Sequence, residues 1–158
     1  MPSKPILIYK LTPTQISLVE RLATSTVGVN MDALDYREIV AYRELAKLGV
    51  AAMQIGARRR VAIVLTDFGL QVRANRYFSK KPVIRLTVPQ VAALRFLLGG
   101  HRHYNEIPAH MIDVCRRMGL RGWAKWDDDD AGGFRVRITT EGWQILKLVD
   151  TSVNTRVD

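Results

Sequence analysis

The chain has 158 residues, 47% of them hydrophobic, and its 24 Lys and Arg against 15 Asp and Glu give a formal net charge of +9. The apolar share is normal for a packed globular protein and excludes a disordered tail, while the positive excess favours nucleic acid as a partner over an indifferent basic surface. A single cysteine, Cys115, excludes an intrachain disulfide and favours a reducing compartment.

Membrane segments are not predicted. No apolar run approaches the roughly 20 residues that span a bilayer, and the N-terminus lacks the charged and apolar regions of a signal peptide. These features predict a soluble, cytoplasmic protein with no membrane partner.

The first predicted helix follows an extended N-terminal segment, residues 1–10. Thr12 and Gln15 have the spacing of a capping box, and Pro13 suits the first helical position, where its missing N–H needs no partner. Apolar residues then recur at helical spacing, at Ile16, Val19, Leu22 and Ala23. The same helix start returns 75 residues later, at Thr87 and Gln90.

Two later segments are repeated in the same order. A helix end with glycine at the C-terminal cap and a strand that closes on Thr-x-x-Gly each occur twice: Lys47–Val50 with Arg117–Leu120, and Val61–Gly69 with Phe134–Gly142. The offsets of 75, 70 and 73 residues are explained by small loop differences. We therefore predict two copies of one unit, each with the order helix, turn, helix, strand, turn, strand, helix.

The predicted fold class is α+β, mainly α, with two tandem units at residues 11–76 and 85–149. Residues 77–84 form the joint, where Pro82 sets an extended entry into the second unit. Residues 150–158 have no apolar pattern and are predicted to fray. Since a core is marginal at this unit size, we expect the units to pack on each other or on a second chain.

In the first unit Asp35 is predicted to cap a helix from Tyr36 to Leu48. Its core positions are Ala41, Leu45 and Leu48, which turns the remaining face outward. A helix in this place is the recognition helix of helix-turn-helix proteins. The residues predicted to contact DNA are Tyr36, Arg37, Val40, Arg43 and Lys47, and a merely solvated face is the alternative.

A hairpin follows this helix, from Ala51 to Gly69. Its turn carries Arg58, Arg59 and Arg60, which repel one another unless a phosphate backbone relieves the repulsion. We predict that these three arginines contact DNA. The helix after the hairpin, predicted from Gly69 to Phe78, adds Arg73 and Arg76 as a second basic patch, and both are also predicted to bind DNA.

The second unit differs at the corresponding turn, where Asp127, Asp128, Asp129 and Asp130 replace the arginines. Four acids oppose contact with phosphates, which leaves a solvated tip, a basic protein surface or a hard cation such as Ca²⁺ as their role. The helix predicted from Pro108 to Met118 buries Met111, Cys115 and Met118. It exposes His110, Asp113 and Arg117.

No enzymatic, cofactor or metal motif is present. The chain has no glycine-rich phosphate loop and no nucleophile elbow. His101, His103 and His110, even with Cys115, do not fall at a zinc spacing. The expectation is a protein that is not an enzyme and that binds no metal or cofactor.

The run Arg60–Gly69, preceded by Leu45, Leu48, Gly49 and Val50, resembles the wing and following helix of winged helix-turn-helix regulators of the MarR type. Residues 135–142, after Met118-Gly119-Leu120, are similar. The resemblance implies binding of double-stranded DNA by the recognition helix and the wing. The two-unit arrangement also resembles tandem winged-helix proteins such as plasmid replication initiators and winged-helix partners of chromosome condensation complexes.

The predicted function is sequence-specific binding of double-stranded DNA, as a transcriptional regulator in a bacterial cell or a phage-infected host. The first unit contacts DNA, and the second unit assists it or mediates self-association as a homodimer. The alternative is a protein-interaction module, such as a viral inhibitor or an adaptor, whose winged-helix surfaces dock on a host protein.

Overall fold

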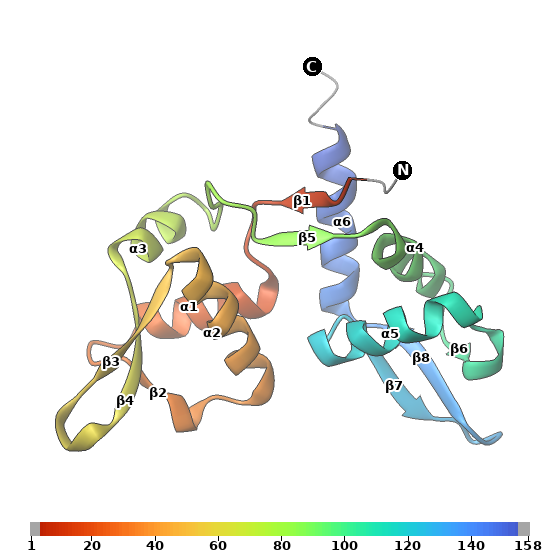
Figure 1. Ribbon diagram of the computed structural model, residues 1–158, viewed down its shortest axis with the longest axis horizontal. Coiled ribbons are helices and arrows are strands. Elements are labelled where there is room, and N and C mark those ends of the chain that lie inside the picture. Colours follow the sequence, from red (N-terminus) through yellow and green to blue (C-terminus); the bar gives the residue numbers. More distant parts are fainter. Residues whose placement is uncertain (1–3, 155–158) are drawn as a thin grey trace. The chain divides into compact units, whose positions relative to one another are not determined.

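The computed structural model describes residues 4–154, which form six α-helices and three small antiparallel sheets (Figure 1). The predicted α+β class is confirmed. The chain divides into two compact units, which are residues 9–83 and residues 4–8 together with 84–154. We call them the first unit and the second unit.

The first unit begins with α1 (Pro13–Ala23) and α2 (Tyr36–Leu48), joined through β2 (Val29–Asn30) and the 3-10 turn η1 (Met31–Ala33). The hairpin of β3 (Ala51–Ile55) and β4 (Val61–Leu65) follows, with the short turn η2 (Ala57–Arg59) at its tip. Helix α3 (Asp67–Ala74) comes next. The three strands form an antiparallel sheet in the order β2-β4-β3.

The second unit repeats this order. It contains β5 (Ile84–Leu86), α4 (Val88–Leu97), β6 (Arg102–His103), the turn η3 (Tyr104–Glu106), α5 (Ala109–Arg121), β7 (Ala124–Asp128), β8 (Phe134–Ile138) and α6 (Thr140–Asn154). Its three-stranded sheet has the order β6-β8-β7, the counterpart of β2-β4-β3.

The N-terminal segment belongs to the second unit. Strand β1 (Ile6–Ile8) pairs antiparallel with β5, with Ile6 opposite Leu86 (Figure 1). Most of the predicted joint belongs to the first unit. Leu11 N–H donates to Tyr77 O and Ser79 N–H donates to Tyr9 O, so residues 77–83 pack within that unit. Helix α6 continues to Asn154, beyond residue 149, and the rest of the predicted tail, 155–158, lies outside the described residues.

The starts of α1, α2 and α4 are those that the sequence predicts, whereas α3 runs from Asp67 to Ala74 and not from Gly69 to Phe78, because Thr66 caps it. Thr12 Oγ1 accepts from the Gln15 N–H, and Gln15 Oε1 accepts from the Thr12 N–H, which satisfies two donors that the first turn of a helix leaves unpaired. Thr87 and Gln90 make the same pair of bonds at α4. Asp35 caps α2 as predicted, with Glu38 as the reciprocal partner.

The offset between equivalent residues of the two units is more constant than the sequence predicts. From β2 to the Thr-x-x-Gly corner each strand and helix of the first unit, and the turn η1, recurs 73 residues later, whereas η2 has no counterpart. The predicted match of Gly49 to Gly119 is therefore wrong. Gly122 ends α5 with φ 80°, as Gly49 ends α2 with φ 80°, while Gly119 lies inside the helix. The residue that ends a helix in this way adopts the left-handed conformation, and in α5 that residue is Gly122.

The Thr-x-x-Gly corner joins the hairpin to the end of the preceding helix. Thr66 Oγ1 donates to Gly49 O at 2.5 Å and accepts from the Gly69 N–H at 3.0 Å. Thr139 makes the equivalent bonds to Gly122 O and the Gly142 N–H. A Cβ on Gly69 would overlap Val50 O, and one on Gly142 would overlap Trp123 O. Glycine recurs at this position because the start of the next helix packs directly against the carbonyl oxygen of Val50 in the first unit and of Trp123 in the second.

Each unit has its own apolar core. In the first unit the predicted core positions of α2 are buried as expected, and Tyr42 joins them. In α5 Cys115 and Met118 are buried as predicted, whereas Met111 is only half-buried. The largest side chains below 2% exposure are Leu11, Leu18, Leu45 and Ile63 in the first unit and Leu86, Leu94, Leu97, Met118 and Ile145 in the second.

Candidate functional site

Helix α2 presents a basic stripe to solvent. Tyr36, Val40, Arg43 and Lys47 are spaced by four, three and four residues, which places them on one face of the helix. The side chains at 36, 43 and 47 are exposed, Tyr36 to 65%, and Val40 is half-buried. Arg37 is also exposed, about 100° around the axis from Tyr36. We call these five residues the α2 stripe.

The acidic side chains of α2 are held by α1. Gln15 Nε2 donates to Glu44 Oε2 at 2.7 Å, and Arg21 Nη1 pairs with Glu38 Oε1 at 2.8 Å. Both partners lie on α1, on the side that α2 packs against. The carboxylates of α2 are thus engaged within the unit, and the solvent side of the helix carries its positive charge.

The Arg-rich hairpin, residues 51–65, carries the second group of predicted contacts. Its strands pair from Ala51 opposite Leu65 to Ile55 opposite Val61, and the Gly56 N–H donates to Arg60 O at 2.9 Å to close the tip. Arg58, Arg59 and Arg60 are all exposed, and within residues 4–154 no ion pair joins them to an acid. The tip is a concentrated, uncompensated positive charge.

The backbone of this tip is strained. Arg58 has φ 63° and Arg59 has φ 56°, the left-handed region in which a side chain costs about 1 kcal/mol per residue. Glycine would adopt the same conformation without that cost. Arginine is therefore a costlier residue than glycine at these two positions of the turn.

The two arginines that follow the hairpin differ in their surroundings. Arg73 forms a two-bond ion pair with Glu20, with Nε–Oε1 at 2.8 Å and Nη2–Oε2 at 3.1 Å, and the Tyr77 hydroxyl donates to the same carboxylate at 2.6 Å. Arg73 therefore joins α3 to α1, and its charge is already paired. Arg76 is exposed, with φ 55°.

The Glu20 cluster makes the first unit sensitive to acid. The hydrogen bond from Arg73, followed by that from Tyr77, lowers the pKa of Glu20 from 4.5 to about 2. Because the pKa is depressed in the folded state, the stabilisation is present above pH 4.5 and is lost as pH falls towards 2. We expect urea unfolding of Glu20→Gln, followed by circular dichroism, to show a smaller loss of stability between these pH values than the wild type.

The matched control for that measurement is Asp32→Asn, which removes an exposed carboxylate of the same unit and leaves the Glu20 cluster intact. It should keep the wild-type pH profile. A Glu20→Gln profile equal to that of the wild type would mean that the ion pair contributes nothing to folding.

The second unit has the same backbone but a different charge. The Asp129 N–H donates to Gly133 O at 2.9 Å, the counterpart of the bond between Gly56 and Arg60, and closes the tip of the acidic hairpin, residues 124–138. Asp127 is neutralised by Lys125 and Arg137, each at 3.5 Å. The positions that correspond to Tyr36, Val40, Arg43 and Lys47 are Ala109, Asp113, Arg116 and Leu120. A basic stripe is therefore absent from α5.

The histidines and the cysteine of this unit are separated. His101 and His110 are exposed, whereas Cys115 is buried, and burial raises the pKa of its thiol. Among the described residues no group of three or more His, Cys, Asp and Glu side chains is arranged to hold a metal ion.

Sequence analysis missed one feature of the second unit. A hollow lies between α5 and the acidic hairpin, and Tyr104, Trp126 and Phe134 line it. Phe134 lies on a predicted strand, whereas Trp126, predicted to lie in the turn, lies on β7, and only the pairing register places the two together on one sheet face. The sequence did carry a signal for it. Tyr104, Trp126 and Phe134 stand where the first unit has Met31, Met53 and Val61, so aromatic residues replace aliphatic ones at three repeat positions.

Within residues 4–154 no helix is both long and apolar enough to cross a membrane. Comparisons with protein-family models, with curated proteins and with solved structures find no match to this chain.

Proposed function

We propose that the chain binds double-stranded DNA through its first unit, as a transcriptional regulator in the cytoplasm of a bacterial cell or a phage-infected host. In this interpretation both units are winged helix-turn-helix units, α2 is the recognition helix and the Arg-rich hairpin is the wing. The order of α1, a short turn, α2 and a hairpin supports it, since a recognition helix follows a first helix and a tight turn in such proteins.

One observation carries the proposal. The first unit carries uncompensated cations at the hairpin tip and on the solvent side of α2, while the acids of α2 are bound by α1. Cations held at a protruding tip and along a helix are suited to a phosphate backbone and a groove, because phosphate contacts supply most of the affinity for DNA.

Selection of genomic DNA fragments with the purified protein at two salt concentrations tests this function. An enriched sequence motif that persists at the higher salt is the expected result, and its symmetry would report how many units read DNA. Retention of DNA without any enriched motif would reduce the proposal to non-specific binding. Failure to retain DNA even at low salt would refute it.

The α2 stripe supplies a second test. Arg37→Ala should weaken binding to the selected sequence about tenfold and relax the preference at one position, as expected for a residue at a base edge. Lys47→Ala should weaken binding to all DNA sequences alike and reduce the log–log salt slope of that binding by about 1, as expected for a phosphate contact. Fluorescence anisotropy with the selected and a scrambled duplex distinguishes the two effects. Arg117→Ala, an exposed arginine of α5, is the control and should change neither.

A second candidate function is favoured by the acidic hairpin. Its uncompensated acids, Asp128 and Asp130, suit a basic protein surface better than DNA, which agrees with a protein-interaction module such as a viral inhibitor or an adaptor. Affinity capture from a host lysate after nuclease treatment tests it. Recovery of one stoichiometric protein would favour this candidate, and loss of all partners on nuclease treatment would favour DNA binding.

A further inference from the structure

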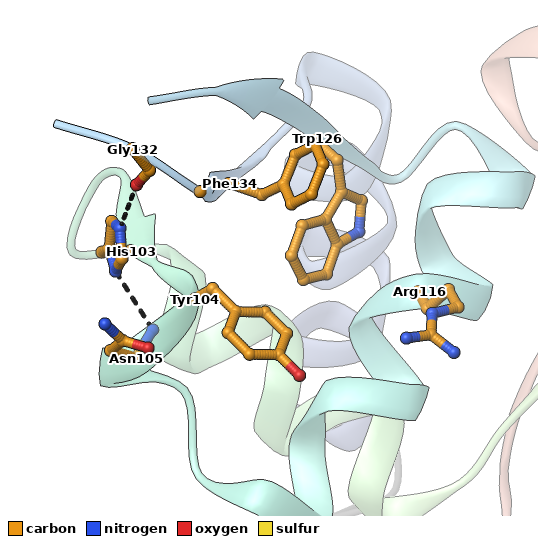
Figure 2. A pocket seen from close by; sticks show the side chains of 8 residues that line it. His103, Tyr104, Asn105, Arg116, Trp126, Gly132 and Phe134 are labelled. Atoms are coloured by element: carbon orange, nitrogen blue, oxygen red, sulfur yellow. Dashed lines mark hydrogen bonds between the residues drawn. The ribbon is translucent and has the colours of Figure 1, made fainter. Parts of the chain in front are cut away.

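The hollow in the second unit is open and aromatic. It has a volume of about 720 Å³ and lies between α5 and the acidic hairpin (Figure 2). Tyr104 is 41% exposed and Phe134 is 53% exposed, so both rings present surface to solvent. The Tyr104 and Trp126 rings have centroids 6.5 Å apart and are tilted by 53°. Rings in this arrangement leave faces open to a guest instead of closing on one another.

Hydrogen bonds hold the walls in place. The Asn105 N–H donates to His103 Nδ1 at 3.1 Å, so the ring proton lies on Nε2, which donates to Gly132 O at 2.9 Å (Figure 2). This neutral histidine ties the turn that carries Tyr104 to the tip of the acidic hairpin. Trp126 Nε1 donates to Cys115 O at 3.2 Å, which fixes the indole against α5. The walls of the hollow are therefore ordered before binding, so little of the binding free energy is spent on ordering them.

The charge around the hollow is polarised. Asp128 is the cross-strand partner of Phe134, which places both side chains on the same face of the hairpin. Asp130 lies on the adjoining turn and is exposed. Arg116 lines the opposite side of the hollow, away from Gly132 and the turn (Figure 2). A cation that enters beside the turn therefore meets aromatic faces and carboxylates together.

We propose that this hollow binds arginine side chains from the Arg-rich hairpin of a second copy of the chain. A guanidinium stacks on aromatic faces and pairs with carboxylates in a way that a lysine ammonium does not. The hairpin tip offers three exposed arginines, held outward by left-handed backbone at Arg58 and Arg59. The two surfaces are complementary in charge, with three arginines at the tip against Asp128 and Asp130 of the hairpin that forms one wall of the hollow.

Such a contact joins different surfaces of two molecules. Each copy offers one tip and one hollow, so copies either exchange tips as a closed pair or add head to tail, and in both cases association grows with concentration. The contact area is small and the contact is ionic, so it is weak and salt-sensitive. It requires no DNA, and it stands or falls separately from the proposed function.

Sedimentation velocity of the full chain at low salt, across a concentration series up to millimolar, tests the contact. The tip variant carries Arg58→Ala, Arg59→Ala and Arg60→Ala, and the hollow variant carries Phe134→Ala, Asp128→Asn and Asp130→Asn. Wild type should associate progressively. Each variant alone should associate at least about tenfold more weakly. An equimolar mixture of the two variants should form pairs and stop there, because it contains one intact tip and one intact hollow per pair.

The matched control for the hollow variant is Asp113→Asn with Asp150→Asn, which changes the charge of the second unit equally at exposed sites outside the acidic hairpin. It should associate as the wild type does. Circular dichroism confirms that each variant is folded. A wild type that remains monomeric throughout, variants that associate normally, or a mixture that forms no pairs would each overturn the proposal.

Discussion

Replacing Arg58, Arg59 and Arg60 together with alanine is expected to weaken binding to duplex DNA at low salt by at least a hundredfold and to reduce the log–log salt slope by up to about 3. Each phosphate contact that is lost removes about 0.9 from that slope, because one fewer set of counterions is released on binding. Alanine carries a Cβ, as arginine does, so the substitution removes charge without relieving the strained backbone of the tip. Titrations by fluorescence anisotropy at several salt concentrations measure both quantities.

Two controls define that result. The triple replacement by lysine keeps the charge and should retain most of the salt slope, which separates charge from loss of the side chain. Replacing Arg95, Arg117 and Lys147 by glutamine removes the same charge from exposed sites of the second unit and should cost much less affinity. A folded triple alanine variant with unchanged affinity would refute the assignment of the hairpin as a DNA contact.

Gly142→Ala is expected to destabilise the second unit by about 3 kcal/mol. The position lies in helix α6, where alanine in place of glycine would ordinarily stabilise by about 1 kcal/mol. The new Cβ would instead overlap Trp123 O, and the backbone must shift at a corner that Thr139 also ties to Gly122. A loss of stability would therefore support overlap of the Cβ with Trp123 O, whereas a gain would show that helix propensity dominates. All three tryptophans belong to the second unit, so urea unfolding followed by tryptophan fluorescence reports on this unit.

The same substitution in the first unit repeats the test. Gly69→Ala should destabilise by a similar amount, measured by circular dichroism, since its Cβ would overlap Val50 O. Gly56→Ala is the matched control, because its φ is −86° and its Cβ would lie 3.7 Å from Arg60 O, an ordinary contact. It should change stability by less than about 0.5 kcal/mol. Stabilisation by Gly69→Ala would show that the corner has room for a side chain.

Local chemistry was readable from the sequence because it involves residues a few positions apart. Thr12 with Gln15 and Thr87 with Gln90 predicted capping boxes, and both helices begin there with those bonds. The glycine that ends α5 was harder to choose. Gly119 follows Met118 and Gly122 follows Arg121 in the same helical stretch, and the helix continues until the left-handed turn fits against the next strand, which is a tertiary requirement.

The paired charges were not readable in the same way. Arg73 was predicted to contact DNA, but Glu20 is 53 residues away in the sequence and its carboxylate reaches Arg73 only after α3 has packed on α1. The pairing of Ile6–Ile8 with Ile84–Leu86 is of the same kind, because a three-residue strand has no periodicity that identifies its partner. Each of these contacts depends on how distant segments are brought together.

The repeat, the caps, the two hairpins and the contrast between Arg58–Arg60 and Asp127–Asp130 follow from residue type and local spacing, so they could be predicted from the sequence. The charges that remain free are set by the tertiary structure. It engaged Glu38, Glu44 and Arg73 within the first unit and left the hairpin arginines exposed. It also placed three aromatic rings beside the acidic turn. The physical reason is that burial and ion pairing depend on distances in space, which register and helix packing set.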